Sequence, residues 1–338
     1  MKKLRAGIVG CGRIASEFDK ELPRKQAFSH AGAYFLCAGT ELVTAADPDA
    51  GKRAAFSKKW GVNEVYADYS AMLKGERLDV LSVATPPSSH LSIVREACRY
   101  PLKAIYCEKP IAESVEDARA ITDLCRKKGV LLVVNHQRRF GLFYQELKKK
   151  LTDGTFGKVQ QVTCHYTRGI SNTCTHMIDL FIFLFGEVTG VEARRSPNAS
   201  PFTDDPNLDG TIYFKSGLTL SLKALDDRRY LILETDILTT KARVTMGEEL
   251  AFAWAKLGKN LLGRPELMPA KSPFKSVYPR YGMVPLDRGV EHIVRCVQKK
   301  EKPVSTGENA TQALGVIRTM LTLAKKAGKN STGTRIAR

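Results

Sequence analysis

The segment 1–50 constrains this chain most, because it reads as a strand, a glycine turn, a helix, a second strand and an acid. The apolar run Leu4 to Val9 predicts a short buried strand, and Leu42 to Ala46 predicts another that ends at Asp47. Between the strands stands the turn sequence Gly10-Cys11-Gly12-Arg13-Ile14-Ala15. This order of elements is typical of a dinucleotide-binding fold.

Each position of the glycine turn has a physical use at a bound pyrophosphate. Gly10 permits the tight turn, and Gly12 lets the backbone approach the phosphates because no Cβ stands in the way. Ala15 still allows close packing of helix against strand, and the helix N-terminus offers free N–H groups to an anion. We therefore expect cofactor contacts at Gly10, Gly12, Arg13 and Ile14. The alternative is a purely structural turn, since glycine turns are common.

Asp47 bears on the choice of cofactor. A carboxylate at the end of the second strand accepts hydrogen bonds from the adenosine ribose hydroxyls and repels the extra phosphate of NADP. The bases Lys52 and Arg53 follow closely and could receive that phosphate if Asp47 turned away. We expect NAD, with NADP as the alternative.

The distance from Gly12 to Asp47 exceeds the usual ~20 residues of this motif. The excess falls between Glu17 and Gly39, where Pro23 and the segment His30-Ala31-Gly32-Ala33 predict an extra loop beside the cofactor cleft.

The length of 338 residues predicts two domains, because single cores stop growing at ~250–300 residues. We place a dinucleotide-binding Rossmann domain at 1–134 and a second α/β domain at 135–338. The longest apolar run of the second half, Leu180 to Phe185, is far shorter than the ~20 residues that cross a bilayer. No apolar signal segment follows the first residues, so we expect a cytoplasmic protein with no membrane partner.

Three further apolar strands are predicted in the first domain, each ending in a polar motif. They are Val80 to Ala84 before Thr85-Pro86-Pro87, Ala104 to Cys107 before Glu108-Lys109-Pro110, and Val130 to Val134 before Asn135-His136. Continuous apolar strands separated by helices indicate a doubly wound parallel sheet. Ligands bind beyond the carboxyl ends of such strands, so we expect Thr85, Pro86 and Glu108 at the cofactor.

The second domain has a different pattern. Alternating polarity predicts strands at 159–166, 211–223 (a hairpin around Ser216-Gly217) and 231–246, which favours a large, mostly antiparallel sheet with one exposed face. A helix is predicted from Thr173 to Phe185, ended by Gly186. The segment 251–285 has no clear period and is predicted to be rich in loops.

Two motifs could carry chemistry. Lys109 stands at the open end of the parallel sheet, where desolvation or a neighbouring acid can change the pKa of its amine. It could then bond a substrate hydroxyl; the alternative is a surface Lys-Pro turn. His176 and Asp179 share one face of the predicted helix, and a histidine there could act as general base. Asn172 lies in the turn before the helix and could bond a substrate hydroxyl. The alternatives are a capping asparagine, a helix-start histidine and an aspartate paired with an arginine.

Two further positions stay open on sequence alone. Arg139, with Arg138 beside it, could clamp a substrate anion or bridge the domains. His90 could lie near the nicotinamide half of the cofactor site or could cap a helix.

The charge and the cysteines exclude some classes of protein. The net charge of +18 comes from scattered basic doublets, which indicates solvated helix faces or attraction of an anionic partner. No nucleic-acid-binding motif accompanies it, so we expect no nucleic-acid partner. The 8 cysteines form no C-x-x-C pair, so we expect neither a disulfide framework nor a metal site.

The chain resembles the glucose–fructose oxidoreductase / inositol dehydrogenase (Gfo/Idh/MocA) family over nearly its whole length. The landmarks are the Gly10 to Ala15 turn, Thr85-Pro86-Pro87, Glu108-Lys109-Pro110, Arg139-Phe140, His176-x-x-Asp179 and Pro303-Val304-Ser305-Thr306-Gly307-Glu308 before a helix. The resemblance implies NAD(P)-dependent hydride transfer to or from a sugar or cyclitol, with Lys109 and His176 catalytic. It also implies a cis peptide before Pro110 and assembly of a dimer or tetramer through the open sheet of the second domain.

The resemblance also bears on the substrate. Many members carry an aspartate four residues before the histidine, whereas this chain has Asn172, as in nucleotide-sugar dehydrogenases of surface-polysaccharide pathways. The leading hypothesis is therefore oxidation or reduction at a secondary alcohol or ketone of a sugar, with a nucleotide sugar favoured. The alternatives are a cyclitol dehydrogenase, a non-enzymatic NAD(P)-sensing protein, and glycoside cleavage through transient oxidation by a retained cofactor.

Overall fold

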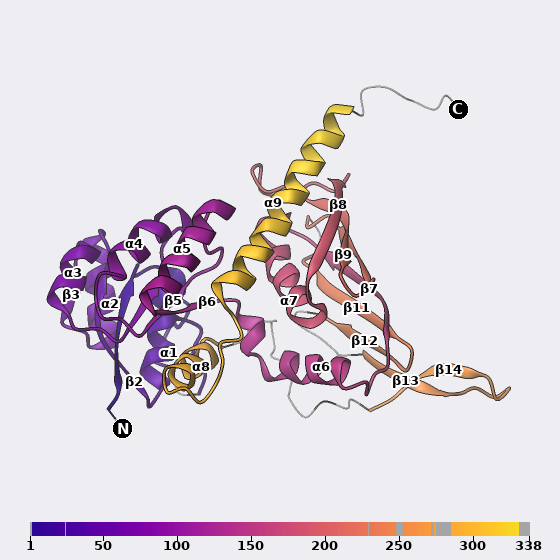
Figure 1. Cartoon of the computed structure of the whole chain (residues 1–338), viewed down its shortest axis with the longest axis horizontal. Helices are drawn as coiled ribbons and strands as arrows, with labels where there is room; N and C mark the ends of the chain where they lie inside the picture. The colour runs from indigo at the N-terminus through magenta and orange to yellow at the C-terminus, as the bar shows by residue number, and fades with distance from the viewer. Residues whose placement is uncertain are drawn as a thin grey trace. The chain divides into compact units, whose positions relative to one another are not determined.

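The computed structural model describes residues 2–23, 25–228, 230–247, 253–271, 274 and 285–330. The chain forms two compact units (Figure 1). The first holds the described residues of Met1–Gly141 and Val284–Leu314, and the second those of Leu142–Met283 and Gly315–Arg338. The predicted ranges 1–134 and 135–338 differ from these units, because α8 (Asp287–Val297) buries Val290 and Ile293 in the core of the first unit.

The first unit is built on a six-stranded parallel sheet, which confirms the predicted doubly wound fold. The strand order is β3-β2-β1-β4-β5-β6, so the order reverses between β1 and β4. The strands are β1 (Leu4–Val9), β2 (Thr40–Ala46), β3 (Glu64–Tyr66), β4 (Val80–Val83), β5 (Ala104–Cys107) and β6 (Leu131–Val134).

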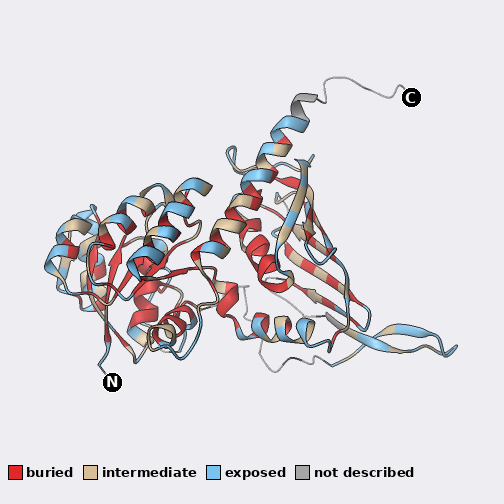
Figure 2. Ribbon diagram, viewed as in Figure 1, coloured by how far each residue is buried: buried red, intermediate tan, exposed pale blue. Residues whose placement is uncertain are grey.

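Helices cover the two faces of this sheet. They are η1 (Arg13–Glu17), α1 (His30–Leu36), α2 (Ala50–Trp60), α3 (Tyr69–Gly75), η2 (Pro87–Ser89), α4 (His90–Ala97), α5 (Val115–Lys128), η3 (Gln137–Phe140) and α8. Alternate residues of β5 enter separate cores: Ile105 and Cys107 join one apolar cluster, and Ala104 and Tyr106 join the other. Figure 2 shows the resulting band of buried strands. This double burial explains why the strands read as continuous apolar runs.

The segment after the glycine turn differs from the prediction. The turn leads into η1, a short helical turn, and the residues His30 to Ala33 form the start of α1 rather than part of a loop. The Ser29 side chain accepts a hydrogen bond from Gly32 N and so caps α1. The predicted extra loop is therefore shorter and lies between η1 and α1.

The second unit contains an eight-stranded sheet, in the order β14-β13-β12-β11-β7-β10-β9-β8. Among the described strands of this sheet, only the β10–β7 pair is parallel, so the prediction of a mostly antiparallel sheet is confirmed. The strands are β7 (Val159–Tyr166), β8 (Val188–Arg195), β9 (Leu208–Phe214), β10 (Thr219–Ala224), β11 (Leu233–Thr239), β12 (Ala242–Met246), β13 (Ala253–Lys259) and β14 (Pro265–Pro269).

The helices of this unit are α6 (Leu142–Thr152), η4 (Gly169–Cys174), α7 (Thr175–Phe185) and the later part of α9 (Gly307–Asn330). Phe185 of α7 packs edge-on against Phe214 of β9, with ring centroids 5.7 Å apart. A Cβ on Gly210 of β9 would lie 2.7 Å from the Met320 side chain of α9. Helices α7 and α9 therefore cover the sheet, as Figure 1 shows.

The segment 251–285, predicted to be rich in loops, contains the strands β13 and β14, which the prediction missed. These strands pair with each other and β13 pairs with β12, through backbone hydrogen bonds that leave side chains such as Leu257 exposed. None of the side chains described in these two strands is buried, so the sequence shows no alternation of polarity there. Other parts of 251–285 lie outside the described residues. No helix in the described ranges is long and apolar enough to cross a membrane.

Candidate functional site

The carboxyl ends of β1, β2 and β4 line a cavity of about 520 Å³ in the first unit. Five of the predicted cofactor residues line it: Gly10, Gly12, Asp47, Thr85 and Pro86. Sequence reasoning missed other lining residues, which are Val9, Ala46, Pro48, Ala67, Asp68, Tyr69, Ala84, Ser89 and Ile93. The short β3 strand and the helix cap at Asp68 were the only signals for some of these. The cavity lies at the switch point of the sheet, where such folds bind nucleotides.

The glycine turn brings its first two glycines to the cavity. Gly10 has a φ of 95°, and a Cβ there would lie 2.6 Å from the carbonyl oxygen of Ala84. A Cβ on Gly12 would meet no atom within 4 Å, so this position is open toward the cavity side. Arg13 and Ile14 follow in η1, and the Arg13 guanidinium lies 5.1 Å from the centroid of the Phe18 ring. Neither Arg13 nor Ile14 is among the described residues that line the cavity.

Asp47 is oriented by backbone N–H groups. Its Oδ2 accepts a hydrogen bond from Cys11 N at 2.8 Å, and its Oδ1 accepts one from Asp49 N at 2.9 Å. The carboxylate therefore joins the glycine turn to the end of β2. Lys52 also lines the cavity, whereas Arg53 donates to the carbonyl oxygens of Asp47 and Pro48.

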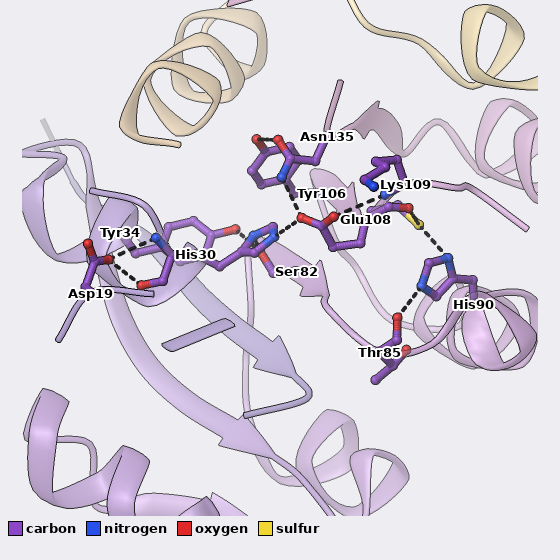
Figure 3. A network of polar contacts seen from close by, with 12 residues as sticks. Asp19, His30, Tyr34, Ser82, Thr85, His90, Tyr106, Glu108, Lys109 and Asn135 are labelled. Atoms are coloured by element: carbon purple, nitrogen blue, oxygen red, sulfur yellow. Dashed lines mark hydrogen bonds and ion pairs between the residues drawn. The ribbon is translucent and has the colours of Figure 1, made fainter. Parts of the chain in front are cut away.

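Glu108, at the end of β5, lies in a buried polar network (Figure 3). Its Oε1 lies 2.8 Å from His30 Nε2 and accepts a hydrogen bond from Asn135 Nδ2 at 2.5 Å. Its Oε2 accepts from Lys109 N at 3.2 Å. Burial raises the pKa of this carboxyl, but the hydrogen bonds and charges of His30, Asn135 and Lys109 outweigh it, and the pKa lies below its usual value.

Lys109 follows directly after Glu108. The Lys109–Pro110 peptide is cis, as expected from the family resemblance. Burial lowers the pKa of the Lys109 amine, with a further lowering by the charge of Arg138 and an opposing effect of Glu108. A lysine in this state gives up its proton more readily than an exposed lysine does.

His90 is fully buried between two loops of the site. Its Nε2 lies 2.9 Å from the carbonyl oxygen of Thr85, and its Nδ1 lies 3.1 Å from that of Ile111. The ring therefore joins the loop after β4 to the loop after β5. In the structure the His90 ring connects these two loops, and its contact with the cofactor stays a prediction.

Arg139 is buried in the first unit. Its Nη1 donates to the carbonyl oxygen of Val304 at 3.0 Å, which links η3 to the segment before α9. This contact tests neither of the two roles suggested for Arg139, so its predicted role in substrate binding stays a prediction.

In the second unit, the turn η4 holds the predicted residue Asn172, and helix α7 holds the predicted residues His176 and Asp179. Asp205 accepts hydrogen bonds from Ser171 N and Asn172 N, at 2.8 Å and 2.7 Å, and fixes the turn of η4. The Asn172 side chain is exposed. His176 lies half-buried in the first turn of α7, and Asp179 lies one turn later with 1% of its surface exposed. The helix ends at Gly186, whose φ is 93°, as predicted.

Sequence reasoning missed His30 as a site residue. Its partner Glu108 is 78 positions away, and its place in the predicted extra loop gave no helical signal. Within the described residues, no group of three histidine, cysteine or acidic side chains is placed to hold a metal ion. The cysteines are all free.

Residues 4–136 match the sequence model of the GFO_IDH_MocA family, described as an oxidoreductase family with an NAD-binding Rossmann fold. A D-apiose dehydrogenase of Paraburkholderia graminis is 28% identical over 236 residues, covering 65% of this chain and 60% of that protein.

Two solved structures share the fold over both units. An oxidoreductase of Desulfitobacterium hafniense, described as NADPH-dependent, has a TM-score of 0.81 and 18% identity, over 97% of both chains. The WlbA dehydrogenase of Bordetella pertussis, crystallised with NADH and UDP-GlcNAcA, has a TM-score of 0.76 and 23% identity, over 96% of this chain and 98% of that one.

Proposed function

We propose that the chain is a dehydrogenase or reductase of sugars, because residues 4–136 match the sequence model of the Gfo/Idh/MocA oxidoreductase family and the first unit is an NAD-binding Rossmann domain. The proposed reaction interconverts a secondary alcohol and a ketone. The observation that carries the proposal is the cavity at Gly10, Gly12 and Asp47, with the acidic and basic pair Glu108-Lys109 at the end of the same sheet.

The proposed cofactor is NAD rather than NADP. Both carboxylate oxygens of Asp47 accept hydrogen bonds from backbone N–H groups, and these bonds keep the carboxylate at the cavity. A fixed negative charge there favours ribose hydroxyls and disfavours a 2′-phosphate. Arg53, one of the two bases that could bind that phosphate, donates to backbone carbonyls. The affinities for NADH and NADPH, measured at one salt concentration, test this choice, and tighter NADPH binding would contradict it.

The proposed catalytic residues are Lys109 and His176. When bound, the nicotinamide ring supplies the hydride chemistry. His176 removes the proton of the substrate hydroxyl, as a histidine near neutral pH can. Lys109 donates to the oxygen on which negative charge develops. Asn172, Asp179 and Arg139 are proposed to bind the sugar hydroxyls or the charged part of the substrate.

The proposed substrate is a nucleotide sugar. The asparagine at 172 in place of the aspartate common in the family supports this choice, and so does the net charge of +18, which attracts a diphosphate. The fold is shared with a dehydrogenase crystallised with a UDP-sugar. Assembly into a dimer or tetramer through the eight-stranded sheet is part of the same proposal, and light scattering would measure it.

The experiment is a measurement of NADH formation with a panel of nucleotide sugars, free sugars and cyclitols. We expect turnover with a UDP-linked sugar and none with the matched free sugar. Turnover with a cyclitol alone would replace the substrate class. Product formation without net NADH would indicate a retained cofactor. Binding of NADH with no turnover on any member of the panel would favour a sensor.

A further inference from the structure

Glu108 lies on the opposite side of the switch point from Asp47. In the strand order, Asp47 follows β2 on one side of β1, and Glu108 follows β5 on the other side. A dinucleotide in this fold lies across the carboxyl ends of the strands. With the adenosine at Asp47, the nicotinamide end therefore falls on the side of β4 and β5, where Glu108 and Lys109 stand.

The segment between η1 and α1 is anchored so that α1 begins at a fixed place. Asp19 accepts hydrogen bonds from Phe28 N and Ser29 N, each at 2.9 Å, and from the Ser29 hydroxyl at 2.6 Å. A Cβ on Gly32 would lie 2.2 Å from Asp19 Oδ2, so the first turn of α1 lies directly against this carboxylate. Farther back, Ala27 N donates to Asp287 Oδ1 at 3.1 Å. The first residue of α1, His30, therefore has little freedom to move.

The His30 ring is fixed on every side. It has no exposed surface. Its Nε2 lies 2.8 Å from Glu108 Oε1, its Nδ1 lies 2.9 Å from Ser82 Oγ, and its ring meets that of Tyr106 edge-on at 4.8 Å between centroids (Figure 3). The Tyr34 hydroxyl lies 2.8 Å from the same Ser82 oxygen. A rotation of the imidazole would break both of its polar contacts in a buried environment, which is unfavourable.

We propose that His30 is a positioning residue for the nicotinamide end of the cofactor site, acting through Glu108 on the Glu108-Lys109 loop. The expected effect of His30 on turnover rests on the proposed function, whereas its expected effect on cofactor binding does not. His30 and Asn135 both contact Oε1 of Glu108 and so fix the carboxylate from one side. The other oxygen, Oε2, accepts the hydrogen bond from Lys109 N and so orients the backbone of Lys109.

The test compares two ligands that differ only at the end in question. NADH carries the nicotinamide, and ADP-ribose lacks it. His30→Leu removes the contact to Glu108 and keeps a similar side-chain volume. We expect NADH binding to weaken about tenfold, because the lost hydrogen bond to a charged group fixes the nicotinamide end of the cofactor site. Binding of ADP-ribose, which lacks the nicotinamide, should stay within about twofold. In His30→Gln, an amide N–H can take the place of Nε2, and we expect NADH binding to recover in large part.

A matched control exists in the same unit. His292 is also buried and forms its own pair with a glutamate, with Nδ1 lying 3.1 Å from Glu301 Oε2. His292→Leu therefore removes another histidine–glutamate pair, which does not contact Glu108. We expect it to lower stability without changing the ratio of NADH to ADP-ribose affinity.

A double-mutant cycle tests the route through Glu108. If His30 acts through that carboxylate, adding His30→Leu to a Glu108→Ala variant should change NADH binding little further. Equal weakening of NADH and ADP-ribose in His30→Leu, or full additivity in the cycle, would overturn the proposal. If His30→Leu does not fold, Ser82→Ala removes only the Nδ1 partner and should shift NADH binding in the same direction by a smaller factor; no shift would also count against it. None of these measurements needs a substrate, so a failure of the proposed sugar reaction is seen separately, in the turnover assay.

Discussion

Two acids end strands of the same parallel sheet, Asp47 after β2 and Glu108 after β5, and they are held in different ways. Asp47 is bound by backbone N–H groups of Cys11 and Asp49, and it lines an open cavity. Glu108 is bound by the side chains of His30 and Asn135, in a buried network. The first arrangement presents a charge to a ligand, whereas the second holds a charge in a set orientation beside a lysine. We propose that the Asp47 side of the sheet serves cofactor affinity alone, whereas the Glu108 side serves chemistry as well as binding of the nicotinamide end.

The largest expected effect lies on the Glu108 side. Lys109→Ala should lower turnover by ~100-fold or more, because a donor to the developing alkoxide is lost. NADH affinity should change by only a small factor. Single-turnover rates and NADH titration measure the two quantities, and Lys109→Arg shows whether charge alone suffices. Unchanged turnover on the true substrate would remove Lys109 from the mechanism.

The next effect concerns stability. Asn135 is 1% exposed, donates to Glu108 and accepts a hydrogen bond from the Tyr106 hydroxyl. Asn135→Leu should lower the free energy of unfolding by about 2 kcal/mol, because it leaves buried polar partners unsatisfied. Tyr106→Phe removes a single hydroxyl and should have a smaller effect. Urea unfolding curves compare the two, and an equal or larger loss in Tyr106→Phe would show that the network does not centre on Glu108.

On the Asp47 side we expect a change in affinity without a change in chemistry. Asp47→Ala should weaken NADH binding about tenfold, which is ~1.4 kcal/mol, and should narrow the gap between NADH and NADPH. The maximal rate at saturating cofactor should be nearly unchanged. A fall in that rate comparable with that of Lys109→Ala would break the division between the two sides.

The smallest effect is a pH dependence of stability. The pKa of Glu108 in the folded protein lies below its usual value, so the unfolded chain binds the proton more readily. The ionised carboxylate then contributes stability above about pH 4.3, the ordinary pKa of glutamate, and this contribution is lost as the pH falls through the folded-state pKa. Unfolding free energies measured between about pH 5 and pH 3 should fall less steeply in Glu108→Gln than in the native chain. Equal slopes would mean that the buried network does not favour the ionised form.

The same contrast explains what could be predicted from the sequence. The contacts of Asp47 involve a glycine turn and a residue two positions away, and local pattern was enough to place the acid at the cavity. The parallel sheet followed from apolar strands buried on both faces. His30 could not be found in this way, because its role depends on a partner 78 positions away. Likewise β13 and β14 are paired by backbone hydrogen bonds, and none of their described side chains is buried, so they leave no pattern of alternating polarity in the sequence.

Helix α8 reaches the first unit only after the whole segment Leu142–Met283 has been synthesised. A ribosome adding ~5–20 residues per second needs roughly seven to thirty seconds for that stretch. During this time the first unit lacks Val290 and Ile293 in its core, and the Tyr106 hydroxyl lacks the backbone of Gly289 beside it. The N-terminal part of the nascent chain therefore stays incompletely packed until α8 has been synthesised. Expression of residues 1–141 alone would keep the chain in that state.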